Sequence, residues 1–232
     1  MNSIMSIYKE FTFGEFSSDD NKHKVEAILK VSTESLDDNH KTYQLFLKPT
    51  QNVKNIYSIH ATNETSPIKL PVSYNHDVAG VNQDVTSPNP LFYIPSEDVP
   101  EPPFPDSKYD SWLGFEYDTQ GQISSIGIDF ADWNDSKTLK ITDGAIFNIN
   151  PTVDNQKNEE DEIMISQLTV DENQEIDITI NIQGQSTITG VNLYQINEIT
   201  FKYDPDDDTD DDTDDDEESY LSTFWNYIIH LF

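Results

Sequence analysis

The stretch YDSWLGFEYDTQGQISSIGIDFADW, residues Tyr109–Trp133, is rich in aromatic and β-branched residues. Two apolar runs, Trp112–Tyr117 and Ile123–Phe130, flank the polar residues Asp118–Gly121, which end in a glycine that can take a positive φ. This pattern predicts a β-hairpin with a four-residue loop. Because both runs are strongly apolar, we expect the hairpin to lie inside a sheet and not at its edge.

Strand-like patterns recur along the rest of the chain. The clearest is the run 176–182, where isoleucine alternates with polar residues so that one face meets the core and the other meets water. Residues 25–31 suit a strand or a short helix, and the apolar run that follows favours an antiparallel strand pair. Further strands are expected at 11–13, 43–47, 55–60, 139–149 (a pair or a bent strand around Asp143-Gly144), 163–170 and 199–203. Many short strands with little helical periodicity predict an all-β, antiparallel two-sheet sandwich over residues 1–203.

Two segments between these strands are expected to be loops. Residues 61–105 contain nine prolines, which disfavour regular strands and long helices. Because the segment also keeps many aromatic and aliphatic residues, we expect an ordered loop packed on the body. Residues 155–161 are expected to form a polar surface loop.

Charge and composition exclude several classes of function. The run 204–218 holds 12 of the 44 acidic residues, and the other 32 still outnumber the 13 basic residues, all of them lysine. A nucleic acid or an anionic membrane is therefore not expected as a partner. The chain has no cysteine, which excludes thiol chemistry. We see no secretory signal at residues 1–16 and no apolar run long enough to span a membrane.

The C-terminal segment divides into two parts. Repeated Asp and Thr residues predict a solvated, extended acidic linker over 204–218, about 50 Å long when stretched. Residues 219–232 predict a short amphipathic helix. Its apolar face consists of Leu221, Phe224, Trp225, Ile228 and Phe232. This face is interpreted as docking in a groove of a partner protein, as packing on the chain's own body or, last, as lodging in a membrane.

Residues that carry catalytic or metal chemistry are sparse. Tyr74-Asn75-His76-Asp77 joins a histidine to a carboxylate, but no nucleophile or phosphate-binding motif accompanies it, so no enzyme activity is expected. Asp129, Asp132 and Asp135 form a hypothetical calcium site, with Asn134 and Asp143 as further oxygen donors. No other cofactor is expected.

Two tryptophans have divided interpretations. If Trp112 and Trp133 were exposed on a sheet face, they would form a platform on which sugars stack. We expect both in the core, where large aromatic side chains are usually buried.

Short, ordered motifs resemble a recurring domain of poorly characterised, predicted exported proteins and of proteins of large DNA viruses. The motifs are YDSW at 109–112, IGIDF at 126–130 with Trp133, and TDGA at 142–145. The resemblance covers roughly residues 43–195. It departs at Leu113-Gly114-Phe115, where a Thr-Ile-Gly-like run would be expected, and in the absence of an export signal. It implies no catalytic residues.

These observations favour a non-catalytic structural or accessory component of a larger assembly, such as a virus particle, docked through its C-terminal aromatic helix. The expected location is a virion or an extracellular assembly. The alternative is a β-sandwich module that binds carbohydrate or a surface through residues 61–105, with or without calcium. A glycoside hydrolase with paired carboxylates ranks last, because nothing marks one pair of acids over another.

Overall fold

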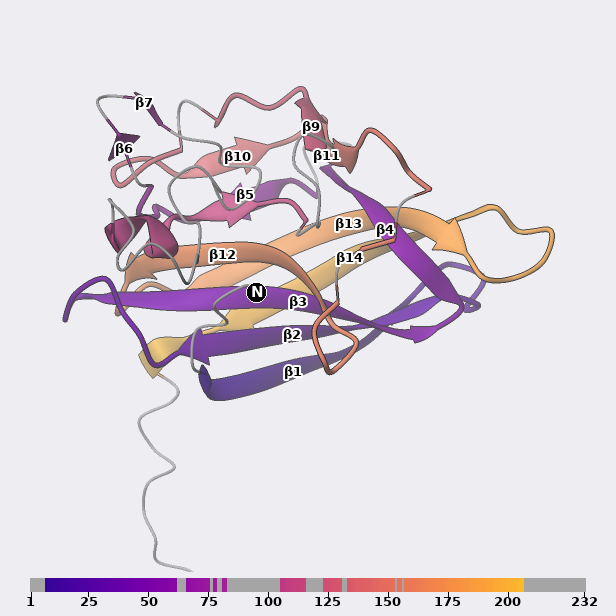
Figure 1. Cartoon of the computed structure of the whole chain (residues 1–232), viewed down its shortest axis with the longest axis horizontal. Coiled ribbons are helices and arrows are strands. Elements are labelled where there is room, and N and C mark those ends of the chain that lie inside the picture. The colour runs from indigo at the N-terminus through magenta and orange to yellow at the C-terminus, as the bar shows by residue number, and fades with distance from the viewer. Residues whose placement is uncertain are drawn as a thin grey trace, which may run out of the picture.

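The chain folds into antiparallel β-sheets in this computed structural model, which describes residues 7–61, 66–75, 77–78, 81–82, 105–115, 123–130, 133–152, 154–155 and 157–206 (Figure 1). The first sheet has five strands in the order β1-β2-β3-β12-β8. Their bounds are β1 Ile7–Ser17, β2 Lys24–Ser32, β3 His40–Gln51, β12 Ile163–Asp171 and β8 Trp112–Leu113. The first three strands follow one another along the chain, and β12 joins them from far downstream.

The second sheet also has five strands, in the order β14-β13-β4-β11-β9. Their bounds are β14 Leu193–Tyr203, β13 Ile176–Ser186, β4 Val53–Ala61, β11 Gly144–Asn148 and β9 Ile123–Ile126. Strand β4 separates the β13–β14 hairpin from the short strands β11 and β9. The second sheet is therefore assembled from three distant parts of the sequence.

Small elements complete the described structure. Strand β5, Ile68–Leu70, pairs with β10, Leu139–Ile141, and β6, Asp77–Val78, pairs with β7, Val81–Asn82. A 3-10 helix, η1, covers Pro105–Tyr109. In the described part of the chain, no helix has the length and apolar character that crossing a membrane requires.

The two five-stranded sheets share one hydrophobic core. The core cluster draws on β2, β3 and β12 of the first sheet and on β4, β13 and β14 of the second. Rings also meet between the sheets, as with Phe13 of β1 and Phe201 of β14, whose centroids lie 6.1 Å apart. The two sheets bury their inner faces against each other. Unfolding of either sheet would therefore expose apolar surface of the other.

Most strand predictions are confirmed. Strands cover the runs 25–31, 43–47, 55–60 and 163–170, and β2 pairs antiparallel with β3. In β13 the side chains of Ile176, Ile178, Ile180 and Ile182 are buried, as the alternation predicts. Strands β10 and β11 flank Asp143, but they pair with different partners and not with each other.

The predicted central hairpin is wrong. In β8, Trp112 pairs with Gln167 of β12 in the first sheet, whereas β9 pairs with β11 in the second. Among the strands that the structure describes, both β8 and β9 are outermost, so the expectation of an interior position is also wrong. Apolar density correctly indicated burial for the first run, where Trp112, Leu113 and Phe115 are buried, but not for the second, where Ile126 is 66% exposed. Apolar density carries no information about which distant strand each run pairs with.

The proline-rich segment is partly as predicted. Its described residues 66–75 pack on the body: the backbone N–H of Tyr74 donates to the Thr169 carbonyl, and the Trp133 indole N–H donates to the Pro71 carbonyl. Regular strands nevertheless occur, because β5 fits between Pro67 and Pro71. Prolines just outside a strand cost no ladder hydrogen bond. Residues 83–104 lie outside the described residues.

Candidate functional site

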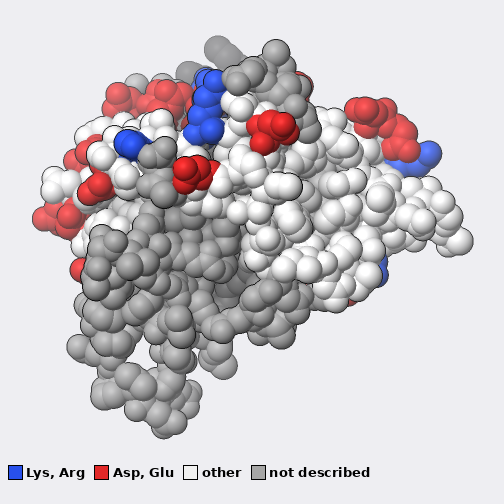
Figure 2. Space-filling view, turned by 90° about the horizontal axis from the view of Figure 1, so that it is seen from above, with Lys and Arg blue, Asp and Glu red and all other residues white. Residues whose placement is uncertain are grey.

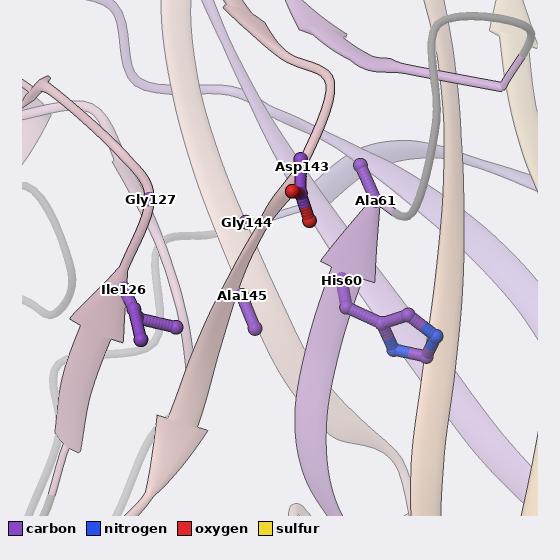
Figure 3. A pocket seen from close by; sticks show the side chains of 7 residues that line it. All are labelled: His60, Ala61, Ile126, Gly127, Asp143, Gly144 and Ala145. Carbon is purple, nitrogen blue, oxygen red and sulfur yellow. The ribbon is translucent and has the colours of Figure 1, made fainter.

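A hollow of about 370 Å³ opens where β4, β11 and β9 lie side by side (Figure 3). It is lined by His60, Ala61, Ile126, Gly127, Asp143, Gly144 and Ala145. We call it the His60 hollow. Its volume lies within the range of small-molecule sites, roughly 300–1,000 Å³.

Strand register brings three of the lining residues into one row. Ala145 of β11 pairs with His60 of β4 on one side and with Ile126 of β9 on the other. The neighbouring residue Ile59 is fully buried in the core, so the row faces outward by strand alternation. Ile126 is 66% exposed and forms an apolar wall.

Two glycines let the backbone segments of the hollow approach closely. Gly127 has a φ of 70°, and a Cβ there would overlap the Asp143 carbonyl oxygen. A Cβ on Gly144 would lie 2.9 Å from Ile128 and 3.0 Å from the Gly127 carbonyl oxygen. The IGIDF and TDGA motifs of the sequence therefore meet here, and their glycines are needed for that contact.

The hydrogen-bonding groups of the hollow are a carboxylate and an imidazole. Figure 3 shows the Asp143 carboxylate above the gap between β11 and β4, with Ile126 on one side and His60 on the other. Burial lowers the pKa of His60, which keeps the ring neutral at pH 7. The Gln195 amide nitrogen lies 3.2 Å from His60 Nε2. A neutral ring that accepts there carries its proton on Nδ1 and can donate from that atom.

An uncharged strip of amides continues from His60 across β13 and β14. We call Gln183, Gln195 and Asn197 the amide row; they alternate with the buried Ile182 and Ile196 and so face outward. The Gln195 side-chain nitrogen donates to Asn197 Oδ1 at 2.7 Å. Asn181 is itself buried, donating to the His60 carbonyl and accepting from the Glu198 N–H.

This arrangement can bind a polar, uncharged group through hydrogen bonds. Asp143 accepts, His60 and the amides donate and accept, and Ile126 contributes apolar contact. The seven lining residues include no Ser, Thr, Cys or Lys that could serve as a nucleophile.

A second, smaller hollow of about 230 Å³ lies near the start of β1 and the end of β14. It is lined by Tyr8, Val31, Lys41, Tyr43, Glu172, Tyr203 and Pro205. The rings of Tyr43 and Tyr203 are 5.5 Å apart, and Tyr8 is 71% exposed. We call it the tyrosine hollow.

The hypothetical calcium site stays a prediction. Asp129 and Asp135 are exposed, and Asp132 lies outside the described residues. Across the part of the chain that the structure describes, no group of three or more His, Cys, Asp or Glu side chains is arranged to hold a metal ion. Asp143, considered as a further ligand, lines the His60 hollow instead.

Other predicted residues divide into two groups. Trp112 and Trp133 are 2% and 0% exposed, which confirms the core interpretation and rules them out as a stacking platform. His76 and the whole predicted helix face, from Leu221 to Phe232, lie outside the described residues.

One buried histidine was not anticipated. His23 is 2% exposed, its Nε2 lies 2.8 Å from Ser186 Oγ, and its ring stacks on Tyr194. Burial also raises the pKa of Tyr194, whose hydroxyl donates to the Asn55 carbonyl. The pair His23–Ser186 ties the β1–β2 turn to the β13–β14 turn. Nothing in the polar turn around His23 signals a partner 163 residues away.

No protein-family model, curated protein or solved structure matches this chain. The family resemblance of the sequence motifs therefore stays a prediction.

Proposed function

We propose that this chain is a non-catalytic accessory or structural component of a larger assembly. Its body, residues 1–203, is a two-sheet β-sandwich that carries an acidic linker, 204–218, and a short amphipathic helix, 219–232. The observation that supports this organisation best is the end of β14. That strand is the outermost of its sheet and ends at Tyr203, directly before the acidic run.

The sequence of the tail supplies the docking element. Like charges at the density of 204–218 repel one another and favour an extended, solvated segment. The apolar helix face that follows needs a surface on which to be buried, because isolated helices of this length are marginal in water. A groove on a partner protein offers that surface.

The resemblance to a domain of large DNA virus proteins supports a virus particle as the assembly. A virion or extracellular assembly is accordingly the proposed location. The strongly acidic body supports a protein partner over nucleic acid or an anionic membrane.

The test replaces the apolar face in the full chain. When purified virus particles are sedimented, the wild type is expected to sediment with them. A Phe224→Ala/Trp225→Ala/Ile228→Ala variant is expected to stay in the supernatant. The matched control, Ser222→Ala/Thr223→Ala/Asn226→Ala, changes the opposite face and is expected to sediment normally. Equal sedimentation of all three proteins would contradict docking through this face.

Thermal unfolding of the same variants separates docking from packing on the chain's own body. If the helix face serves a partner, the apolar-face variant melts at the temperature of the wild type. A clear drop in its melting temperature, absent from the control, would show that the face packs on the body and would overturn the proposal.

A second candidate function is a carbohydrate-binding or surface-binding module. The His60 hollow and the amide row favour it, because they present uncharged hydrogen-bonding groups beside an exposed apolar side chain. On this candidate function the contact would lie on the second sheet, whereas the sequence suggested residues 61–105.

A further inference from the structure

The outer face of the second sheet is short of charge around the His60 hollow. Asp143 is the single charged residue among the seven that line it, and the exposed Glu198 follows directly after the amide row. Figure 2 shows a described area without charged side chains, with acidic side chains along its upper border. In a chain of net charge −31, a face of this kind suits an uncharged ligand.

Two exposed hydrogen bonds and one part-buried hydrogen bond already link the polar groups of this face before any ligand binds. His60 is bonded to Gln195, Gln195 to Asn197, and the buried Asn181 fixes the His60 carbonyl. Groups that are already ordered lose little conformational entropy on binding. Preorganisation of this kind is what a specific polar site requires.

We propose that the His60 hollow binds one unit of a neutral saccharide, whose chain continues along the amide row. Each sugar hydroxyl is both donor and acceptor. It can therefore donate to the Asp143 carboxylate or accept from the His60 Nδ1–H. The apolar side of the sugar ring lies against Ile126. Gly127 and Gly144 let the backbone segments beside the hollow approach closely, because a Cβ on either would overlap neighbouring atoms.

Charge argues against other ligand classes. The Asp143 carboxylate and the excess of 31 acidic residues disfavour phosphates, nucleotides and acidic sugars. The proposal rests on the second candidate function, a carbohydrate-binding module. It is independent of docking through the tail, so the variants that test one leave the other unchanged.

The experiment measures binding of four uncharged probes to the full chain by titration calorimetry. The probes are cellohexaose, maltohexaose, laminarihexaose and chitohexaose, with an alginate oligosaccharide as the acidic comparison. We expect at least one neutral probe to bind in the millimolar range or tighter, and the acidic probe not to bind. Chelator is expected to have no effect, because the site uses no metal.

Variants then locate the site. Asp143→Ala and Gln195→Ala are each expected to weaken binding about tenfold, the loss of a hydrogen bond to a charged or preorganised group. Asp154→Ala, an exposed acid in a different loop, and Tyr8→Ala, in the tyrosine hollow, are expected to bind as the wild type does. Melting curves confirm that every variant is folded.

Several outcomes would overturn the proposal. These are no binding of any neutral probe, tighter binding of alginate, loss of binding in Tyr8→Ala with retention in Asp143→Ala, or preference for a neutral Asn/Gln peptide over all four oligosaccharides.

Discussion

Gly127 combines a positive φ with a lack of space, and this makes it a sharp test of the site's geometry. Gly14 also has a positive φ, 104°, but a Cβ there would meet nothing within 4 Å. We expect Gly127→Ala to lower the free energy of unfolding by about 1–3 kcal/mol more than Gly14→Ala, because overlap with the Asp143 carbonyl adds to backbone strain. Urea denaturation of both variants measures the difference. Equal losses would mean that β9 and β11 are not as close as described.

Asn155 is the clearest case of a polar residue with a hidden structural role. Its side chain accepts from the Ile56 N–H at 2.6 Å and donates to the Ile56 carbonyl at 2.8 Å, and it is 7% exposed. The prediction that 155–161 is a polar surface loop is therefore wrong at this residue, because the amide substitutes for a strand partner of β4.

Replacing Asn155 tests this role. Asn155→Ala removes both hydrogen bonds to buried backbone groups and is expected to cost about 2 kcal/mol or more of unfolding free energy. The neighbouring Asp154 is exposed, and Asp154→Ala is expected to change stability by less than about 0.5 kcal/mol. Chemical denaturation compares them, and a loss in Asn155→Ala no larger than in the control would contradict the role.

At the scale of elements, Lys30 links β1 and β2 to the residues that precede β12. Its ammonium lies 2.7 Å from Glu162, 3.1 Å from Glu160 and 3.1 Å from Glu10, and the side chains of Lys30 and Glu162 are 7% and 3% exposed. These carboxylates raise the pKa of Lys30 even though burial opposes the charge. Lys30 in turn lowers the pKa of Glu160 below 4.5.

The direction of these shifts fixes the pH range in which the cluster stabilises the fold. The stabilisation from Glu160 is present above pH 4.5 and is lost as the pH falls through its lower folded-state pKa. The stabilisation from Lys30 is present below pH 10.5 and is lost as the pH rises through its higher folded-state pKa.

We therefore expect Lys30→Met to be most destabilised at neutral pH, by about 3–5 kcal/mol, since it leaves a buried carboxylate without its cation. The deficit relative to wild type should shrink as the pH falls through the lowered folded-state pKa of Glu160, because the wild type then loses the stabilisation that the Lys30–Glu160 pair contributes. Unfolding at pH 7 and pH 4 measures it. Lys54→Met, which removes a hydrogen bond to Gln185, is the control and should show no such pH dependence. A deficit that grows in acid would contradict the assignment.

Elements with a local pattern could be predicted from the sequence. The alternation of isoleucines in β13 and the pairing of β2 with β3 depend on neighbouring residues, and both predictions are confirmed. The partners of β8 and β9 depend on strands that lie far away in the sequence. Apolar density indicates burial but not register, so the hairpin prediction failed.

The candidate site shows the same limit. The sequence marks Asp143 as an oxygen donor, but nothing local places it beside one hollow with His60. They meet because Gly144 pairs with Ala61 and Ala145 with His60 across β11 and β4. The sequence shows which residues can carry chemistry. It does not show which of them the register of distant strands brings together.

For the whole molecule, the shared core determines how the protein unfolds. Leu29 of β2 and Ile199 of β14 belong to different sheets, and both are 0% exposed in one core cluster. Removing either side chain exposes apolar surface to which both sheets contribute. We therefore expect the two sheets to unfold together in one transition and not one after the other.

We expect Leu29→Ala and Ile199→Ala each to lower the free energy of unfolding by about 2–5 kcal/mol while leaving a single transition. Circular dichroism follows the strands of both sheets, and fluorescence in a Trp225→Phe background follows the buried Trp112 and Trp133. The two signals should coincide in both variants, with Gln185→Ala as a surface control. A second transition, or curves that separate in one variant, would show that the sheets unfold independently. If they coincide, the His60 hollow persists for as long as the first sheet does, although every strand that lines it belongs to the second.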